Sequence, residues 1–137
     1  MWVVSFVFVG LEEVLNAIVE RAEAGVQVRV LLDHHVDAFK EVSGDLFNRG
    51  LGDSVWLWAD EHRDLDGGRV ASLHAKCAIA DGHSAFISSA NLTNKAMQEN
   101  LEVGLLVTGG PTPMTLKRNF DQLSQDGMLT NERPAGQ

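Results

Sequence analysis

Two apolar runs separated by an amphipathic stretch constrain the fold of this chain more than any other feature. Residues 1–9 (MWVVSFVFV) and residues 26–32 (VQVRVLL) have the composition of buried strands. Between them, apolar residues recur at helical spacing, and Gly25 is placed to end the helix. Strand, helix and strand with short joins form a β-α-β unit, so we expect two parallel strands with a right-handed crossover.

The stretch from Ser72 to Glu102 (SLHAKCAIADGHSAFISSANLTNKAMQENLE) predicts three further strands. Residues 72–80 form the first, and Asp81-Gly82 is typical of a tight hairpin turn. Residues 84–88 (SAFIS) return antiparallel to it, and residues 101–107 form the third. Because residues i and i+2 share a face of a strand, His74 and Lys76 project together.

Five polar side chains of this stretch can gather at one end of the sheet: His74, Lys76, Ser89, Asn91 and Glu102. A neutral imidazole can attack phosphorus or transfer a proton, and a lysine can hold a phosphate oxygen. Serine and asparagine can donate further hydrogen bonds, and a carboxylate can fix the tautomer of the imidazole. We find no cluster of carboxylates, cysteines or histidines beside these residues in the sequence, and therefore expect no metal in the site.

The spacing of these residues resembles the HKD signature of the phospholipase D superfamily. The signature reads H-x-K-x4-D, then S-x-N, then N-x-E, and it falls on His74, Lys76, Asp81, Ser89, Asn91, Asn100 and Glu102. The likeness covers about residues 2–125. It implies a phospholipase D-like α/β/α sandwich, with a mixed sheet flanked by helices, over residues 1–126, followed by a C-terminal tail at 127–137.

The resemblance also implies a role for each residue. His74 would be the nucleophile or the general acid, and Glu102 would orient it. Lys76 and Asn91 would bind phosphate with help from Ser89. Asp81 belongs to the signature, with a mainly structural role. The family's reaction needs no cofactor.

A single HKD motif has a consequence for assembly. The family's site uses two histidines, one that becomes a phosphohistidine and one that protonates the leaving group. A chain with one motif therefore implies a homodimer with the site across a two-fold axis. Alternatively, the chain is a fragment of a longer protein. It also resembles the phospholipase-D-like component of DISARM phage-defence systems, in which case it would be the C-terminal part of such a protein.

The function that follows is a metal-independent phosphodiesterase, a nuclease acting on DNA rather than RNA through a phosphohistidine. Two alternatives stay open: a phospholipase or transphosphatidylase, and a non-catalytic HKD domain that binds nucleic acid or protein in a larger defence complex. The net charge of −8 argues against extensive contacts with the phosphate backbone of DNA and against binding to an anionic membrane. Residues 1–9 are too short to insert across a membrane. The single Cys77 favours a reduced, cytoplasmic setting.

Three other features carry weaker expectations. His34 and His35 follow a strand, but adjacent residues of an extended chain point opposite ways and no further ligand pair has suitable spacing, so we expect a substrate contact or solvent exposure rather than a metal. Arg63, in the polar loop at residues 60–71, could reach substrate or stay solvated. Trp56 and Trp58 share a face of a short strand, and we expect them to pack in the core.

Overall fold

The computed structural model describes residues 1–6, 8–10, 12–63, 65–66 and 69–131. Its central sheet contains β1 (Trp2–Ser5), β3 (Arg29–Leu32), β4 (Val55–Trp58), β7 (Cys77–Ala80), β8 (Ser84–Ser88), β10 (Gly104–Thr108) and β11 (Leu129–Asn131). The helices are α1 (Glu12–Glu23), α2 (Phe39–Asn48), α3 (Asn94–Gln98) and α4 (Pro111–Gln125), with short 3-10 turns η1 (Gly52–Ser54) and η2 (Asp60–His62). Two small pairs complete the described elements: β2 (Phe8–Val9) with β9 (Leu92–Thr93), and β5 (Leu65–Asp66) with β6 (Arg69–Val70).

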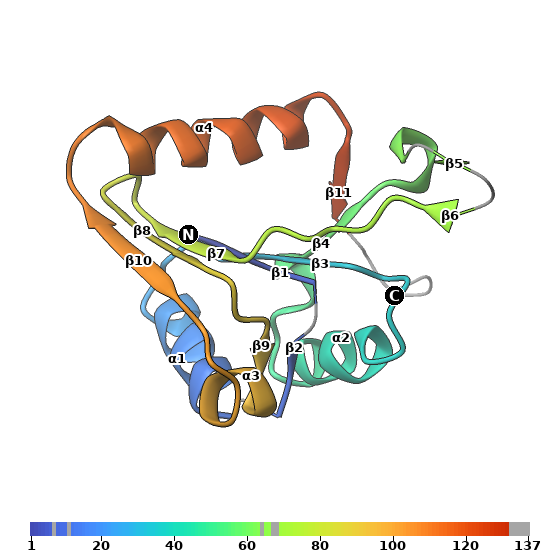
Figure 1. Cartoon of the computed structure of the whole chain (residues 1–137), viewed down its shortest axis with the longest axis horizontal. Coiled ribbons are helices and arrows are strands. Elements are labelled where there is room, and N and C mark those ends of the chain that lie inside the picture. The colour runs from blue at the N-terminus through green and yellow to red at the C-terminus, as the bar shows by residue number, and fades with distance from the viewer. Residues whose placement is uncertain (7, 11, 64, 67–68, 132–137) are drawn as a thin grey trace.

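The sheet is the middle layer of an α/β/α sandwich, as predicted. Its seven strands follow the order β10-β8-β7-β1-β3-β4-β11. Helix α4 covers one face, and α1 and α2 cover the other (Figure 1). The sheet is mixed, because β1, β3 and β4 are parallel while β7, β8, β10 and β11 each pair antiparallel with a neighbour.

The predicted β-α-β unit is present. Strands β1 and β3 pair in parallel, from Trp2 opposite Arg29 to Ser5 opposite Leu32. Helix α1 joins them, and Gly25 follows its end with a φ of 87°, in the left-handed region that glycine adopts without a steric penalty. The Gly25 amide donates to Ala22 O at 2.9 Å, which closes the last turn of the helix.

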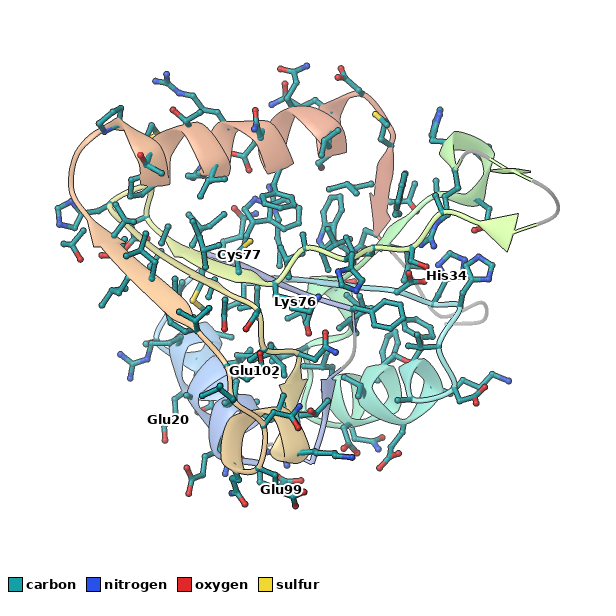
Figure 2. All side chains as sticks on the ribbon, viewed as in Figure 1. Glu20, His34, Lys76, Cys77, Glu99 and Glu102 are labelled. Carbon is teal, nitrogen blue, oxygen red and sulfur yellow. The ribbon has the colours of Figure 1, made fainter. Side chains whose placement is uncertain are left out.

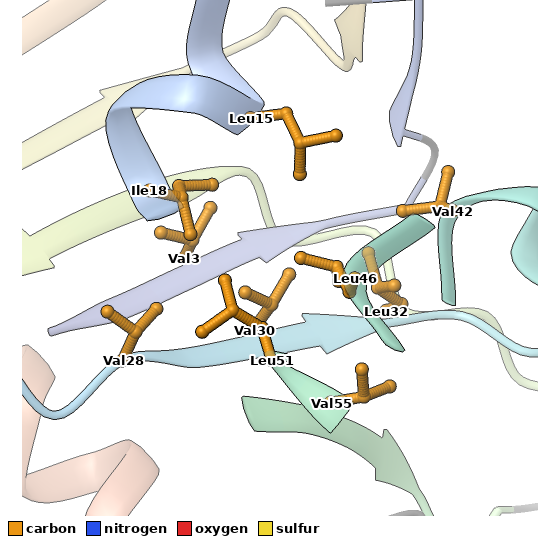
Figure 3. Close-up of a cluster of buried hydrophobic side chains, with 10 residues drawn as sticks. All are labelled: Val3, Leu15, Ile18, Val28, Val30, Leu32, Val42, Leu46, Leu51 and Val55. Atoms are coloured by element: carbon orange, nitrogen blue, oxygen red, sulfur yellow. The ribbon is translucent and has the colours of Figure 1, made fainter. Parts of the chain in front are cut away.

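Side chains of the central strands alternate between two cores, as expected for strands buried on both faces. Figure 3 shows the core on the α1 and α2 side, where Val3, Val30 and Leu32 meet Leu15 of α1 and Leu46 of α2. The core on the α4 side is built on Trp2, Val4, Leu31, Ile79, Ala85 and Leu129. Trp56 and Trp58 pack against this second core, which confirms the prediction of core packing.

The three predicted strands between residues 72 and 107 form, with shorter bounds. Strand β8 covers Ser84–Ser88 as predicted, whereas β7 begins only at Cys77 and β10 only at Gly104. Side chains take part in holding the residues before these two strands: Leu73 N donates to Asp33, and Val103 N donates to Ser89. Single backbone bonds, from Ser88 N to Lys76 O and from Ser89 N to Val103 O, add to them. His74, Lys76 and Glu102 therefore lie in extended segments just outside the sheet.

The C-terminal region differs from the tail predicted at 127–137. Strand β11 pairs antiparallel with β4 at the edge of the sheet. The Asn131 Nδ2 atom donates to Asp53 O at 2.7 Å and to Val55 O at 3.0 Å. The domain thus reaches at least Asn131, and the remaining predicted tail, at 132–137, lies outside the described residues.

Within the described ranges, the helices are too short or too polar for any of them to traverse a lipid bilayer.

Candidate active site

Several of the predicted site residues lie together at one end of the sheet, and the strand directions explain why. His74 and Lys76 lie just before β7, and Glu102 lies just before β10. Ser89 lies just after β8, which runs antiparallel to both of those strands. The start of β7, the end of β8 and the start of β10 therefore lie at the same end of the sheet. Figure 2 labels Lys76 and Glu102 at this end, on the segments that lead into β7 and β10, the two strands on either side of β8.

His74 and Lys76 form the first half of the site. The Lys76 Nζ atom donates to His74 O at 2.9 Å and lies 3.1 Å from His74 Nδ1. Because an ammonium group only donates, Nδ1 is the acceptor in this arrangement. The imidazole is exposed, with its ring centroid 5.8 Å from the ring of Phe6. His74 is thus open to a ligand, with a cation beside it.

Ser89, Asn100 and Glu102 form the second half. Ser89 Oγ donates to Glu102 Oε2, and Asn100 Nδ2 donates to Glu102 Oε1 at 3.3 Å. Ser89 Oγ also accepts from Val103 N at 3.1 Å. The contacts found in the described residues do not include a hydrogen bond between Glu102 and His74, so the orienting role of Glu102 stays a prediction.

Ser88 links the two halves. Its amide donates to Lys76 O at 3.1 Å, and its Oγ accepts from Ala90 N at 3.0 Å. Asn91 follows three residues later, and its buried Oδ1 is without a hydrogen-bond partner in the part of the chain that the structure describes. A buried amide oxygen left unpaired is costly, so a donor from a ligand or from another chain would satisfy it.

Asp81 does not join this group. It occupies the hairpin turn at the opposite end of β7, where Asp81 and Gly82 have φ values of 55° and 67° and His83 N donates to Ala80 O at 2.9 Å. With a rise of about 3.3 Å per strand residue, Asp81 lies on the order of 16 Å from Lys76. Asp81 therefore lies apart from the other predicted site residues, its catalytic assignment stays a prediction, and its place in the turn agrees with the structural role expected of it.

A buried ion pair beneath His74 was missed by the sequence reasoning. Asp33 Oδ1 accepts from Arg63 Nη1 at 3.1 Å, and the two side chains are 1% and 0% exposed. Asp33 Oδ2 accepts from Leu73 N at 2.8 Å, immediately before His74. Burial alone would raise the pKa of Asp33, but the hydrogen bonds from His35 N, Leu73 N and Arg63 outweigh it and lower that pKa.

The prediction that Arg63 reaches substrate or solvent was wrong, because its guanidinium is fully engaged inside the protein. It donates to Trp58 O at 3.2 Å and to Ala71 O at 3.0 Å, and it stacks 4.9 Å from the Trp58 ring. The sequence feature that could have indicated this ion pair is Asp33, an acid directly after a buried strand. A buried carboxylate needs a partner for its charge.

His34 and His35 also differ from expectation. They lie in a turn after β3 instead of in an extended segment, so both rings face the same way, with centroids 4.4 Å apart. His34 Nε2 lies 3.1 Å and His35 Nε2 2.7 Å from Asp60 Oδ1. A third potential metal ligand therefore lies beside the two histidines, and it comes from η2, which follows β4.

Cys77 is not a competing nucleophile. It is half-buried beside Lys76, and burial raises the pKa of its thiol to about 11. Since the thiolate is the reactive form, the thiol stays neutral and inert near neutral pH.

The family model described as the PLD-like domain of cardiolipin synthase matches residues 1–124. This chain belongs to the phospholipase D superfamily. The matched range includes His74 and Lys76, just before β7, and Asp81 in the hairpin turn.

Relatives within the superfamily are longer proteins. The chain is 31% identical over 99 residues to the DISARM protein DrmC of Bacillus paralicheniformis (strain ATCC 9945a / NCIMB 11709 / CD-2), covering 72% of this chain and 39% of DrmC. It is 26% identical over 128 residues to the probable cardiolipin synthase YwiE of Bacillus subtilis (strain 168), covering 92% of this chain and 24% of YwiE. The chain thus spans well under half the length of these curated relatives.

Solved structures share the phospholipase D fold. NucT from Helicobacter pylori aligns with a TM-score of 0.72 and 20% identity, covering 96% of this chain and 80% of NucT. The phospholipase D family member Nuc from Salmonella typhimurium aligns with a TM-score of 0.64 and 22% identity, covering 97% of this chain and 80% of Nuc.

Proposed function

We propose that this chain is a metal-independent phosphodiesterase of the nuclease type, which cleaves DNA through a phosphohistidine on His74. The observation that carries the proposal is the pairing of an exposed His74 with Lys76 at the sheet end that also holds Ser89 and Glu102. The phospholipase D superfamily and the fold of NucT and Nuc support phosphodiester chemistry at this place.

In the proposed reaction, His74 Nε2 attacks phosphorus and the bond to the leaving oxygen breaks. The leaving oxygen takes a proton from the histidine of a second HKD motif. Water then attacks the phosphohistidine, gives its proton to that second histidine and frees His74. Lys76, Asn91 and Ser89 hold the non-bridging oxygens, where negative charge accumulates.

This reaction requires Lys76 to move from its position in the free site. An imidazole that attacks through Nε2 carries its proton on Nδ1, yet Nδ1 now accepts from Lys76 Nζ. A bound phosphate would draw the ammonium away and let Nδ1 donate to a carboxylate. Glu102 is the proposed acceptor, after its contacts with Ser89 and Asn100 rearrange.

The test of this function is cleavage of labelled single- and double-stranded DNA by the wild-type chain in excess EDTA. We expect cleavage to persist in EDTA and a labelled phospho-protein to accumulate when the reaction is quenched early. Cleavage that needs an added divalent metal, or the absence of any phospho-protein during active turnover, would contradict the mechanism.

An exposed apolar surface beside the site favours a second copy of the chain as its partner. The four side chains involved are Leu101, Val103, Leu105 and Leu106, which are 102%, 75%, 62% and 67% exposed. They flank Glu102 and continue along β10, the edge strand of the sheet. Exposed apolar residues along an edge strand favour an interface, and a second HKD motif is what a one-motif site lacks.

We therefore expect a native mass of about twice 14.9 kDa in solution. The double variant Leu101→Glu/Val103→Glu places charges in the interface, so it should become monomeric and lose cleavage while its circular dichroism stays unchanged. The matched control is Met114→Glu, an exposed apolar residue of α4. Sedimentation velocity checks both. A wild-type monomer with full activity would contradict the homodimer.

Lipid phosphodiester cleavage is the second candidate. A largely apolar pocket of about 220 Å³ opens beside Lys76 and Ser88, between α1 and the sheet, and YwiE is a probable cardiolipin synthase. Sedimentation with anionic vesicles, and release of headgroups from them, would favour this reading over the nuclease.

If neither DNA nor lipid is cleaved, the non-catalytic binding role stays open, which the likeness to DrmC of a DISARM system supports. A cytoplasmic location stays a prediction.

A further inference from the structure

We propose that His34, His35 and Asp60 form a binding site for a borderline transition-metal ion such as Zn²⁺, separate from the HKD residues. Each residue offers one ligand atom, and the three atoms lie within 4.8 Å of one another. Figure 2 shows His34 at the side of the sheet from which β5 and β6 project, away from Lys76.

The chemistry of the three donors selects the class of metal. Two imidazole nitrogens and one carboxylate oxygen suit Zn²⁺, Co²⁺ or Ni²⁺, whereas Mg²⁺ and Ca²⁺ prefer sets made of oxygen alone. At metal–ligand bonds of about 2.0–2.2 Å, neighbouring ligand atoms of a tetrahedral site are about 3.3 Å apart. His34 Nε2 at 3.1 Å and His35 Nε2 at 2.7 Å from Asp60 Oδ1 need only small shifts to reach that spacing.

The backbone already holds these donors together. Asp33 Oδ1 accepts from His35 N at 3.0 Å, which fixes the turn after β3. Asp60 begins η2, whose turn closes through His62 N and Ala59 O at 3.1 Å. A preformed turn on each side lowers the ordering cost of binding.

The local charge also favours a cation. Asp33 and Asp60 carry two negative charges against the single positive charge of Arg63, which leaves a net charge of −1 with neutral imidazoles. One contact must change on binding. Ligation through His34 Nε2 puts that ring's proton on Nδ1, so the 3.5 Å approach of Arg63 Nη2 to Nδ1 has to lengthen.

A bound ion would tie the turn after β3 to the turn after β4. Asp33 accepts from both His35 N and Leu73 N, so the metal site and the segment that leads into His74 share one carboxylate. The ion would therefore stabilise the end of the sheet without taking part in the reaction at His74.

The experiment is titration of the metal-free chain with Co²⁺, followed by visible absorption, and with Zn²⁺, followed by competition with a chromophoric chelator. We expect saturation at one ion per chain and a cobalt spectrum with d–d bands. The intense sulfur-to-metal band of a thiolate should be absent, since Cys77 is not among the three ligands. Zn²⁺ should also raise the thermal unfolding midpoint.

Variants locate the site. His34→Ala, His35→Ala and Asp60→Asn should each abolish the stoichiometric phase, whereas His62→Ala, His74→Ala and His83→Ala should retain it. If a ligand variant fails to fold, the wild-type cobalt spectrum still decides between nitrogen–oxygen and sulfur ligation. Absence of saturable binding, or its loss in His74→Ala with retention in His35→Ala, would overturn the proposal. Because His74→Ala should be inactive yet bind metal, failure of one proposal is distinguishable from failure of the other.

Discussion

His74→Ala should lower the rate of DNA cleavage in EDTA by about 10²–10⁴-fold or more, the range that a positioned acid–base group contributes. The reason is that Lys76 and the Ser89–Glu102 group can still hold a phosphate, but nothing remains to attack it. The measurement is single-turnover cleavage of end-labelled single- and double-stranded DNA. Binding of DNA should change little, since an imidazole contributes less to ground-state binding than a lysine does.

The matched control is His83→Ala, an exposed histidine in the hairpin turn at the far end of β7. It should cleave at the wild-type rate. Equal cleavage by wild type and His74→Ala would place the chemistry elsewhere or in a contaminating nuclease. In a mixed dimer with wild type, His74→Ala should reduce the rate as strongly as in the homodimer if both histidines serve one site.

Arg63→Met should destabilise the fold by about 3–5 kcal/mol, the cost of breaking a buried ion pair by removing one partner. Asp33 would stay buried at 1% exposure with its negative charge uncompensated. Urea unfolding at neutral pH, followed by tryptophan fluorescence, measures the loss. The matched control is Arg49→Met, which breaks the exposed pair with Glu12 and should cost less than about 1 kcal/mol.

The pH dependence of this difference has a definite sign. The pKa of Asp33 is lowered in the folded chain, so its contribution to stability is present above the ordinary value of 3.8 and is lost as pH falls through the folded pKa. The gap between wild type and Arg63→Met should therefore shrink in acid, because a protonated Asp33 no longer needs the guanidinium. A gap that is constant from pH 7 to acid would argue that Arg63 acts through packing against Trp58 alone.

Local pattern was enough to predict the elements that carry the site. Apolar spacing and Gly25 predicted the β-α-β unit, and Asp81-Gly82 predicted the hairpin between β7 and β8. These features depend on residues close in sequence, where periodicity and turn preferences dominate. The family signature then placed His74 and Lys76 correctly beside each other at one end of the sheet.

Long-range pairing of polar groups could not be read from the sequence. Asp33 meets Arg63 and Leu73 across gaps of 30 and 40 residues, and His34 and His35 meet Asp60 through a turn. The strand ends were misplaced for the same reason. Ser89 Oγ takes the Val103 amide that a longer β10 would have placed in a ladder, and no local rule anticipates that exchange.

The position of β1 in the sheet affects how the chain folds during synthesis. Strand β1 precedes both of its neighbours along the chain and lies between them, β3 and β7, in the sheet. The strand that pairs with its other edge, β7, is not synthesised until residues 77–80. One edge of β1, with Trp2, Val3 and Val4, therefore stays unpaired while more than half of the chain is synthesised. Non-local pairing of this kind slows folding and exposes apolar strands to association. Chains that end before β7 therefore leave this edge of β1 open to association, and without β8 and β10 the site around His74 cannot assemble.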